Sequence, residues 1–489
     1  AYAIKKNLDF DIYDINSAVL EASSHGTTYI RLPPGRDKPG KAALLCANLY
    51  GSIFAPRLFS NLLYNWMMVN GFVANAHDPC LFTRWDKDGP VHVIAHVDDV
   101  GCIAKTHQVK EFYKEFSKPE TGFSITRHGA LGIECKRYLG IEVERDNKKG
   151  EFLLSNDHLI KGLLEKVGER IKGMPPEDVA MRDERLSNGD AVKDLDERKK
   201  QGLDKLPFRS YLGGLGYIML SSRPDLAFSY KELARFNTIY GKPHWEALLK
   251  TMSYLNKTKD THKLRISKSG GTRLEAYCDA DWNASDLHLS TTGWIVFMGN
   301  APVSWCSQMQ PATARSTCEA EFISLSHLSH EVVYLSQLTK SLRIPTDDIP
   351  IHCSQGPHNC ESAYKIWEEY TNMASPDSEK HEPAMVWSDS TSAISNAKTP
   401  FGWLTNKLRH IKTAFHFVKQ YVIPNDNGAK MHLESVPKYS ERHFNLWHVR
   451  GDDNPSDIMT KGMGDKAMKS NQKKEVFQRH ARFCLGIRE

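Results

Sequence analysis

Two apolar runs separated by a pair of acids form a clear local pattern near the start of the chain. Residues 91–104, VHVIAHVDDVGCIA, place Asp98 and Asp99 between two strand-like segments. This pattern predicts a β-hairpin that carries both carboxylates at its tip. A second strand-like segment, residues 11–20, supplies another acid, Asp14.

Other segments show helical or alternating patterns. Apolar residues at Phe322, Leu325, Leu328 and Val332 recur at the spacing of a helix, and residues 159–164 do the same. Residues 273–279 alternate and predict an exposed-edge or half-buried strand. The chain therefore mixes helices and strands, which indicates an α/β (α+β) multidomain protein.

Polar and charged stretches divide the chain into four parts. The predicted boundaries are residues 1–150, 151–265, 266–465 and a basic, helical tail at 466–489. Within them, the charged region 170–205, and residues 182–200 above all, is predicted to be a solvated linker or insertion. Residues 354–384 are predicted to be a surface insertion around a short helical island at 364–370.

Composition narrows the class of protein. The 489 residues are 40% hydrophobic, enough for two to four cores, and 64 basic against 59 acidic residues give a net charge of +5. This balance permits a nucleic-acid partner without demanding one. Ten cysteines form no CxxC pair, which argues against a zinc site or a disulfide framework and favours a reducing compartment.

Apolar runs are too short to cross a bilayer, which takes roughly 20 residues, and residues 1–8 do not form a signal peptide. The expectation is an intracellular protein without a membrane partner, in a cytoplasmic particle or the nucleus, with an organelle not excluded.

The acids at the hairpin tip have a chemical interpretation. Neighbouring carboxylates repel one another unless a cation offsets their charge. Phosphoryl transfer with two metal ions needs carboxylates from different strands, and Asp14, Asp98 and Asp99 meet that need. An ordinary polar Asp-Asp turn is the alternative that the dipeptide alone favours.

Ordered motifs extend this picture. They are Asp14-x-x-x-Ala18-x-Leu20, Leu49-Tyr50-Gly51, Ala55-Pro56-Arg57, Asp78-Pro79-Cys80-Leu81-Phe82 and Val97-Asp98-Asp99, followed by Tyr138-Leu139-Gly140-Ile141-Glu142, Arg223-Pro224-Asp225 and His244-Trp245. In this order they resemble the reverse transcriptase region of copia-type (Pseudoviridae-like) LTR retrotransposon Pol. The resemblance implies a right-hand polymerase palm and thumb followed by a ribonuclease H-like mixed sheet with flanking helices. It assigns catalysis to Asp14, Asp98 and Asp99, and primer contact to Leu139 and Gly140.

Several positions depart from the family pattern. Thirteen residues precede Asp14, where the family has a fingers segment, so most of the fingers are expected to be missing, and another protein chain or a larger assembly to supply them. In the nucleotide pocket, which also holds Arg57, Val19 replaces an aromatic residue, Phe54 a glutamine and His96 a tyrosine. The alternative is that Val19, Phe54 and His96 are packing residues of the palm.

A second set of acids comes from four predicted elements. Asp279 lies near a strand end, Glu321 near a helix start, Asp389 at another strand end, and Asp457 after a proline in a first helical turn. The words ADW, EAEF, SDS and PSDIMTK around them resemble, in order, the ribonuclease H of the same family. Asp281 and Glu319 are nearby acids, and Glu321 is preferred because it precedes the apolar helix face. Singly, each acid would be assigned to a helix cap or to the surface.

Three further segments carry weaker predictions. The basic and aromatic residues 407–419, with His410, Phe415 and Phe417, resemble a family region beside the nuclease site, or form a core-facing helix with a basic outer face. Residues 448–451 are a possible mobile loop for product release. Residues 466–482 bind phosphates nonspecifically or form a solvated helix.

The predicted functions are hydrolysis of RNA in RNA–DNA hybrids and RNA-templated DNA synthesis, with RNA, DNA and the hybrid as partners. Two Mg²⁺ per active site are expected, with Mn²⁺ as a substitute. The expected ligands are Asp14, Asp98, Asp279, Glu321, Asp389 and Asp457. The alternative is a domesticated fragment, inactive as a polymerase, that serves as a structural or RNA-binding subunit. The short start, the pocket changes and the added residues 354–383 and 439–444 motivate it, whereas mutually repelling carboxylates argue against it.

Overall fold

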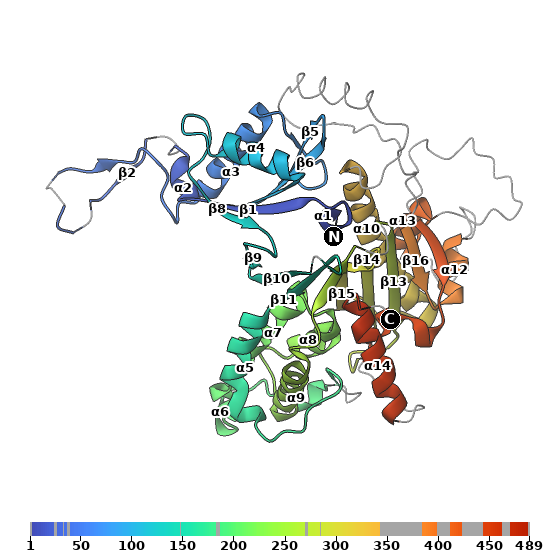
Figure 1. Cartoon of the computed structure of the whole chain (residues 1–489). Helices are drawn as coiled ribbons and strands as arrows, with labels where there is room; N and C mark the ends of the chain where they lie inside the picture. Colours follow the sequence, from blue (N-terminus) through green and yellow to red (C-terminus); the bar gives the residue numbers. More distant parts are fainter. Residues whose placement is uncertain are drawn as a thin grey trace, which may run out of the picture. The chain divides into compact units, whose positions relative to one another are not determined.

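The computed structural model describes most of the chain, which divides into two compact units (Figure 1). The described residues are 2–23, 27–32, 34–36, 40–146, 148–181, 186–268, 272–283, 285–342, 384–398, 411–422, 444–461 and 470–487. The N-terminal unit comprises residues 2–139 and 337–381, and the C-terminal unit comprises residues 140–336 and 382–489. The predicted insertion at 354–384 lies almost entirely outside the described residues, as do its helical island and residues 439–443.

The N-terminal unit is built on a six-stranded antiparallel sheet in the order β4-β5-β6-β7-β1-β8. Its elements are α1 (Tyr2–Lys5), β1 (Asp9–Ile15), α2 (Ala18–Glu21), β2 (Tyr29–Ile30), β3 (Ala43–Leu44), α3 (Ala55–Val69), β4 (Val73–Ala74), β5 (Leu81–Asp86), β6 (Gly89–His96), β7 (Asp99–Ala104), α4 (Thr106–Phe116), β8 (Ile125–Ala130) and β9 (Arg137–Tyr138). Helices α3 and α4 contribute Phe59 and Phe112 to one core with Tyr13 and Val93 of the sheet. The sheet therefore presents one face to its two longest helices.

Two apolar runs on either side of the acids explain the predicted hairpin. Val91 and Val93 of β6 and Val100 and Cys102 of β7 are fully buried. The two strands pair antiparallel, from His92 opposite Ile103 to His96 opposite Asp99. Val97 at the tip has a φ of +56°. A β-branched residue disfavours this left-handed conformation, so the turn is strained. The structure confirms the hairpin and places Asp98 and Asp99 at its tip.

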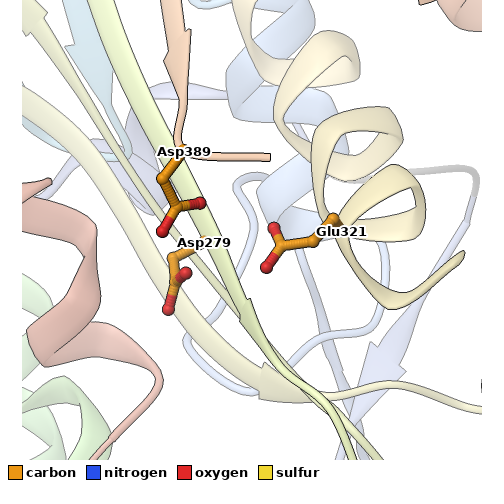
Figure 2. Close-up of side chains that lie close together, drawn as sticks. All are labelled: Asp279, Glu321 and Asp389. Atoms are coloured by element: carbon orange, nitrogen blue, oxygen red, sulfur yellow. The ribbon is translucent and has the colours of Figure 1, made fainter. Parts of the chain in front are cut away.

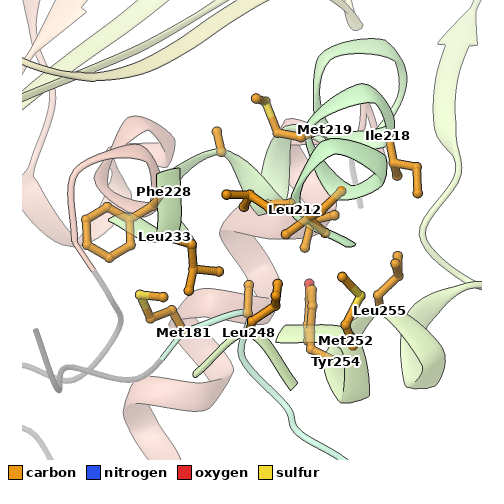
Figure 3. Packing of buried hydrophobic residues seen from close by; sticks show 14 of the residues in the cluster. Met181, Leu212, Ile218, Met219, Phe228, Leu233, Leu248, Met252, Tyr254 and Leu255 are labelled. Carbon is orange, nitrogen blue, oxygen red and sulfur yellow. The ribbon is translucent and has the colours of Figure 1, made fainter. Parts of the chain in front are cut away.

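The C-terminal unit begins with a short sheet and a group of helices. Strands β10 (Ile141–Asp146), β11 (Glu151–Ser155) and β12 (Leu264–Ser267) pair in sequence. The helices are α5 (Asp157–Ile171), η1 (Asn188–Asp190), α6 (Leu195–Lys200), η2 (Leu203–Lys205), α7 (Phe208–Ser221), η3 (Pro224–Leu226), α8 (Ala227–Ala234) and α9 (Lys242–Thr258). Figure 3 shows their shared apolar core, which includes Leu212, Leu233 and Leu248.

A five-stranded mixed sheet forms the rest of this unit, in the order β15-β14-β13-β16-β17. Its elements are β13 (Leu274–Asp281), β14 (Thr291–Met298), β15 (Ala301–Met309), α10 (Thr317–Ser341), β16 (Ala384–Ser388), α12 (Thr391–Lys398), α13 (Lys412–Tyr421), β17 (Phe444–His448), η6 (Gly451–Asp453), η7 (Pro455–Met459) and α14 (Ser470–Cys484). β13, β14 and β15 are antiparallel, and β13, β16 and β17 are parallel. The structure thus confirms a mixed α/β protein with several sheets.

Both faces of the five-stranded sheet are covered, which corrects one prediction. Leu274, Ala276 and Cys278 of β13 face the core shared with α10, α12 and α13, whereas Tyr277 faces the helical core that includes α14. β13 is therefore the central strand, not an edge or half-buried one. The polar residue Glu275 gave β13 the sequence pattern of an edge strand. In the structure its carboxylate is satisfied, because it accepts a 2.7 Å hydrogen bond from the Tyr277 hydroxyl.

The charged segment predicted to be a solvated linker is anchored to the core at several residues. Val179, Met181 and Leu203 belong to the helical core. The guanidinium of Arg198, a residue 7% exposed, donates to the carbonyl of Tyr240 at 2.9 Å and lies over its ring. A few buried apolar residues and one satisfied arginine hold this segment to the core, whereas residues 187–197 are half-buried or exposed.

The C-terminal tail is helical, as predicted, but it is not simply a basic surface helix. Phe477, Ala481 and Cys484 of α14 are buried in the helical core beside Ile458 and Met459 of η7. The predicted boundary near residue 265 also falls inside the C-terminal unit. None of the described helices combines the length and apolar character that a membrane span requires.

Candidate functional site

Three acids converge in the C-terminal unit. Asp279 lies near the end of β13, Glu321 lies in the first turns of α10, and Asp389 directly follows β16. One oxygen from each carboxylate lies within 4.8 Å of the others, and Figure 2 shows the three side chains gathered at one point. We call these residues the acid cluster.

The sheet topology brings the acid cluster together. Parallel neighbours β13 and β16 pair through Cys278 and Ser388, so the residues that follow, Asp279 and Asp389, emerge side by side. Helix α10 is docked over them because the Ser324 hydroxyl donates a 2.7 Å hydrogen bond to the carbonyl oxygen of Asp279. The position of each acid therefore follows from backbone elements rather than from a flexible loop.

The electrostatics of the cluster favour a bound cation. Burial, together with Asp279 and Asp389, raises the pKa of Glu321, and burial and Asp279 raise the pKa of Asp389 to about 6. Glu321 Oε2 and Asp389 Oδ1 are buried without a hydrogen-bond partner. A divalent cation would satisfy both oxygens and offset the repulsion, so the residues present fit Mg²⁺ or Mn²⁺.

Asp457 lies beside the cluster but outside the group of three. It occupies η7, where its Oδ1 accepts a 2.5 Å hydrogen bond from Lys461 Nζ. Burial and Asp279 raise the pKa of Asp457 to about 7. Asp457 is thus the fourth acid of the site, at present paired with a lysine.

Two residues of this region escaped the sequence analysis. The Thr460 hydroxyl donates to Asp279 Oδ2, and Lys461 Nζ lies 3.7 Å from the same oxygen. Asp457 and Lys461 are four residues apart, the spacing that brings side chains together on a helix. This spacing within the PSDIMTK motif was the sequence signal for a contact between Asp457 and Lys461.

A glycine allows η7 to approach the cluster. Gly293 of β14 pairs with Asp279 across the sheet. A Cβ atom there would lie 2.6 Å from Met459 Cβ and 2.6 Å from Thr460 Cγ2. Normal carbon contacts are about 3.5–4.0 Å, so a residue with a side chain would push η7 away.

The two nearby acids are arranged differently. Glu319 accepts a 2.8 Å hydrogen bond from the backbone N–H of Arg315 and so supports the start of α10. Asp281 ends β13 and is not one of the three gathered carboxylates. The structure thus places Glu321, rather than Glu319, in the acid cluster.

The N-terminal unit brings its own acids close. Asp14 of β1 pairs directly with Asp99 of β7, and the backbone N–H of Ile15 donates to the carbonyl of Asp98 at 2.9 Å. Burial, followed by Asp98 and Asp14, raises the pKa of Asp99. All three residues are described, yet they do not form a group as tight as the acid cluster.

The predicted pocket residues lie on α2, at the start of α3 and at the end of β6. Val19 is half-buried in α2, Phe54 precedes α3 with 51% of its surface exposed, and Arg57 is exposed in the first turn of α3. His96 ends β6, pairs with Asp99 and is exposed. Phe54 and His96 are thus both exposed within this unit.

The remaining predicted segments are placed in part. Leu139 and Gly140 form the turn between β9 and β10, with φ values of +48° and +75°. Phe417 of α13 stacks on His330 of α10, with ring centroids 3.7 Å apart. His410 and the side chain of Phe415 lie outside the described residues. Residues 448–451 begin at the last residue of β17, and the N–H of Val449 donates to the carbonyl of Ser388.

Comparisons with known proteins place the N-terminal part of the chain in a family. Residues 1–169 match the family described as reverse transcriptase (RNA-dependent DNA polymerase). The retrovirus-related Pol polyproteins from transposons RE2 and RE1 of Arabidopsis thaliana are each 28% identical, over 69% of this chain and 22% of their own length. The Pol polyprotein from transposon TNT 1-94 of Nicotiana tabacum is 26% identical, over 72% of this chain and 26% of its own. The chain belongs to the copia-type retrotransposon Pol family.

The family match covers the N-terminal part of the chain most directly. The matched residues 1–169 contain Asp14, the 98–99 pair and every predicted pocket and primer residue, and they form the reverse transcriptase domain of this copia-type protein. The chain spans 22–26% of the length of these three curated relatives. The acid cluster lies outside the matched residues, so its function rests on its own geometry.

Proposed function

We propose that the acid cluster hydrolyses the RNA strand of RNA–DNA hybrids in a reaction that depends on divalent metal ions. The observation that carries this proposal is the convergence of Asp279, Glu321 and Asp389 within 4.8 Å, with two buried oxygens left unpartnered. A site this rich in negative charge is costly unless cations bind it. Carboxylate oxygens are also the ligands that Mg²⁺ takes in phosphate chemistry.

Each residue has a distinct part in this proposal. Asp279, Glu321 and Asp389 would hold one ion, and Asp457 would complete the site for a second. When bound, such ions activate water and offset the charge that develops on the phosphate and the leaving oxygen. Thr460 orients Asp279 through its hydroxyl, and Ser324 fixes the backbone of Asp279 against α10.

The choice of RNA–DNA hybrid rests on family membership and nucleic-acid geometry. A hybrid is distinguished from a DNA duplex by the 2′-hydroxyls of one strand and by the shape of its minor groove. The four motif words around the acids resemble the family ribonuclease H in order. A reverse transcriptase domain in the same chain would produce such hybrids.

We also propose RNA-templated DNA synthesis at Asp14, Asp98 and Asp99. The direct pairing of Asp14 with Asp99 across β1 and β7, within the residues that match the reverse transcriptase family, favours this second activity. Primed RNA template, deoxynucleotides and Mg²⁺ test it, with Asp98→Asn as the inactive variant. Asp279→Asn is the reciprocal control, since it should leave synthesis intact.

Labelled RNA–DNA hybrid and Mg²⁺ test the nuclease. Wild-type chain should cleave the RNA strand, and Asp279→Asn and Asp389→Asn should each lose cleavage. Asp260→Asn, an exposed acid after α9, is the matched control and should cleave normally. Binding of the hybrid without cleavage by folded wild-type protein would refute the nuclease and favour the recruited RNA-binding subunit.

A further inference from the structure

A lysine occupies the space between two acids of the site. Lys461 Nζ lies 2.5 Å from Asp457 Oδ1 and 3.7 Å from Asp279 Oδ2. The side chain of Asp279 is 2% exposed and that of Asp457 is 19% exposed. The ammonium group of Lys461 therefore neutralises carboxylates that have little access to water.

The backbone aims this lysine at the cluster. The N–H groups of Thr460 and Lys461 both donate to the carbonyl of Asp457 at 3.1 Å. Upstream, the Asn454 amide donates to the carbonyl of Cys278 at 3.0 Å, which ties η7 to β13 beside Asp279. On the other side, Cys484 of α14 contacts the carbonyl of Pro455. The turn that carries Lys461 is thus fixed from both sides.

The acids of the site are not equivalent. Asp279, Glu321 and Asp389 each offer an oxygen within 4.8 Å of the others, and Glu321 Oε2 and Asp389 Oδ1 are buried without a hydrogen-bond partner. Asp457 offers its Oδ1 to Lys461 instead. An ion bound between Asp279 and Asp457 would meet a like charge at short range, which disfavours it.

We propose that Lys461 is a tethered counter-cation that holds Asp457 and Asp279 in place before metal binds, and that competes with the second divalent ion for them. This inference rests on the proposed metal-dependent nuclease and names a positioning residue for it. The first ion binds the acid cluster without displacing Lys461. The second ion binds only as the ammonium leaves Asp457.

Metal binding without nucleic acid tests this role. Electron paramagnetic resonance of Mn²⁺ counts the ions bound to the full chain, in an Asp14→Asn/Asp98→Asn background that weakens the N-terminal acids. Lys461→Met keeps the unbranched stem and removes the charge, and it should tighten the weaker Mn²⁺ site about tenfold, or about 1.4 kcal/mol. Lys461→Arg keeps the charge and should resemble wild type.

Thermal unfolding supplies an independent readout. In EDTA, Lys461→Met should unfold at a lower temperature than wild type, because buried Asp279 and half-buried Asp457 lose their counter-charge. Mn²⁺ should then raise its unfolding temperature more than it raises that of wild type. Lys461→Arg guards against a general folding defect.

Three results overturn the proposal: no tightening in Lys461→Met, unchanged stability of that variant in EDTA, or no Mn²⁺ bound at the cluster of either protein. Hybrid cleavage is scored separately. Tighter Mn²⁺ binding in Lys461→Met with no cleavage by wild type would reject the nuclease and keep the counter-cation.

Discussion

Gly293→Ala tests whether η7 must sit tightly against the acid cluster. The added Cβ would lie 2.6 Å from Met459 Cβ and Thr460 Cγ2, and 3.0 Å from the carbonyl carbon of Met459. Since a normal carbon contact is about 3.5–4.0 Å, η7 must move by about 1 Å. Overpacking of this kind costs about 1–3 kcal/mol of unfolding free energy.

The displacement also reaches the chemistry, because η7 carries Asp457 and leads into Thr460 and Lys461. Misplacement of about 1 Å at an active site lowers the rate about 100-fold. Hybrid cleavage and thermal unfolding of the same protein measure the two effects.

Gly213→Ala is the matched control, since a Cβ there meets nothing within 4 Å in the exposed face of α7. It should keep full cleavage and gain about 0.5–1 kcal/mol of stability. Cleavage by Gly293→Ala within threefold of wild type, with unchanged unfolding, would refute the view that η7 positions the site.

Three further predictions concern the metal ions, the Arg223–Asp225 ion pair and two buried histidines. EDTA should abolish hybrid cleavage and Mg²⁺ should restore it, while cleavage that persists in EDTA would contradict a metal site. Asp225→Asn should lower the unfolding free energy by about 3–5 kcal/mol, because it leaves Arg223, 1% exposed, without its carboxylate at 2.7 Å; a loss below about 1 kcal/mol would show that the pair matters little. Burial lowers the pKa of His92 and of His480 to about 4, whereas an unfolded histidine titrates near about 6.5. The unfolded chain therefore takes up protons first, and stability should fall between about pH 6.5 and 4 by up to about 3 kcal/mol for each histidine. His480→Gln should flatten this slope in the C-terminal unit, and an unchanged slope would contradict the assignment.

The fold was predictable where local patterns and burial agree. The β6–β7 hairpin has an apolar run on each side of its acids, and the apolar spacing from Phe322 to Val332 forms one buried face of α10. Prediction failed where a polar side chain is satisfied inside the fold. Glu275 made a central strand resemble an edge, and Arg198 made a packed segment resemble a linker.

The site was predictable in its acids and not in their pairing. Asp279, Glu321 and Asp389 belong to sequence motifs that lie at strand ends and a helix start, so their convergence could be expected. Whether Asp457 joins them depends on side-chain geometry within η7, which no spacing rule fixes. Gly293 was likewise visible only as part of a strand, because its role depends on how closely η7 approaches.

Cleavage of a labelled RNA–DNA hybrid in Mg²⁺ tests the central claim most directly. We predict that the wild-type chain cuts the RNA strand, that Asp389→Asn does not, and that Asp260→Asn does. Equal cleavage by wild type and Asp389→Asn, or none by either folded protein, would contradict it.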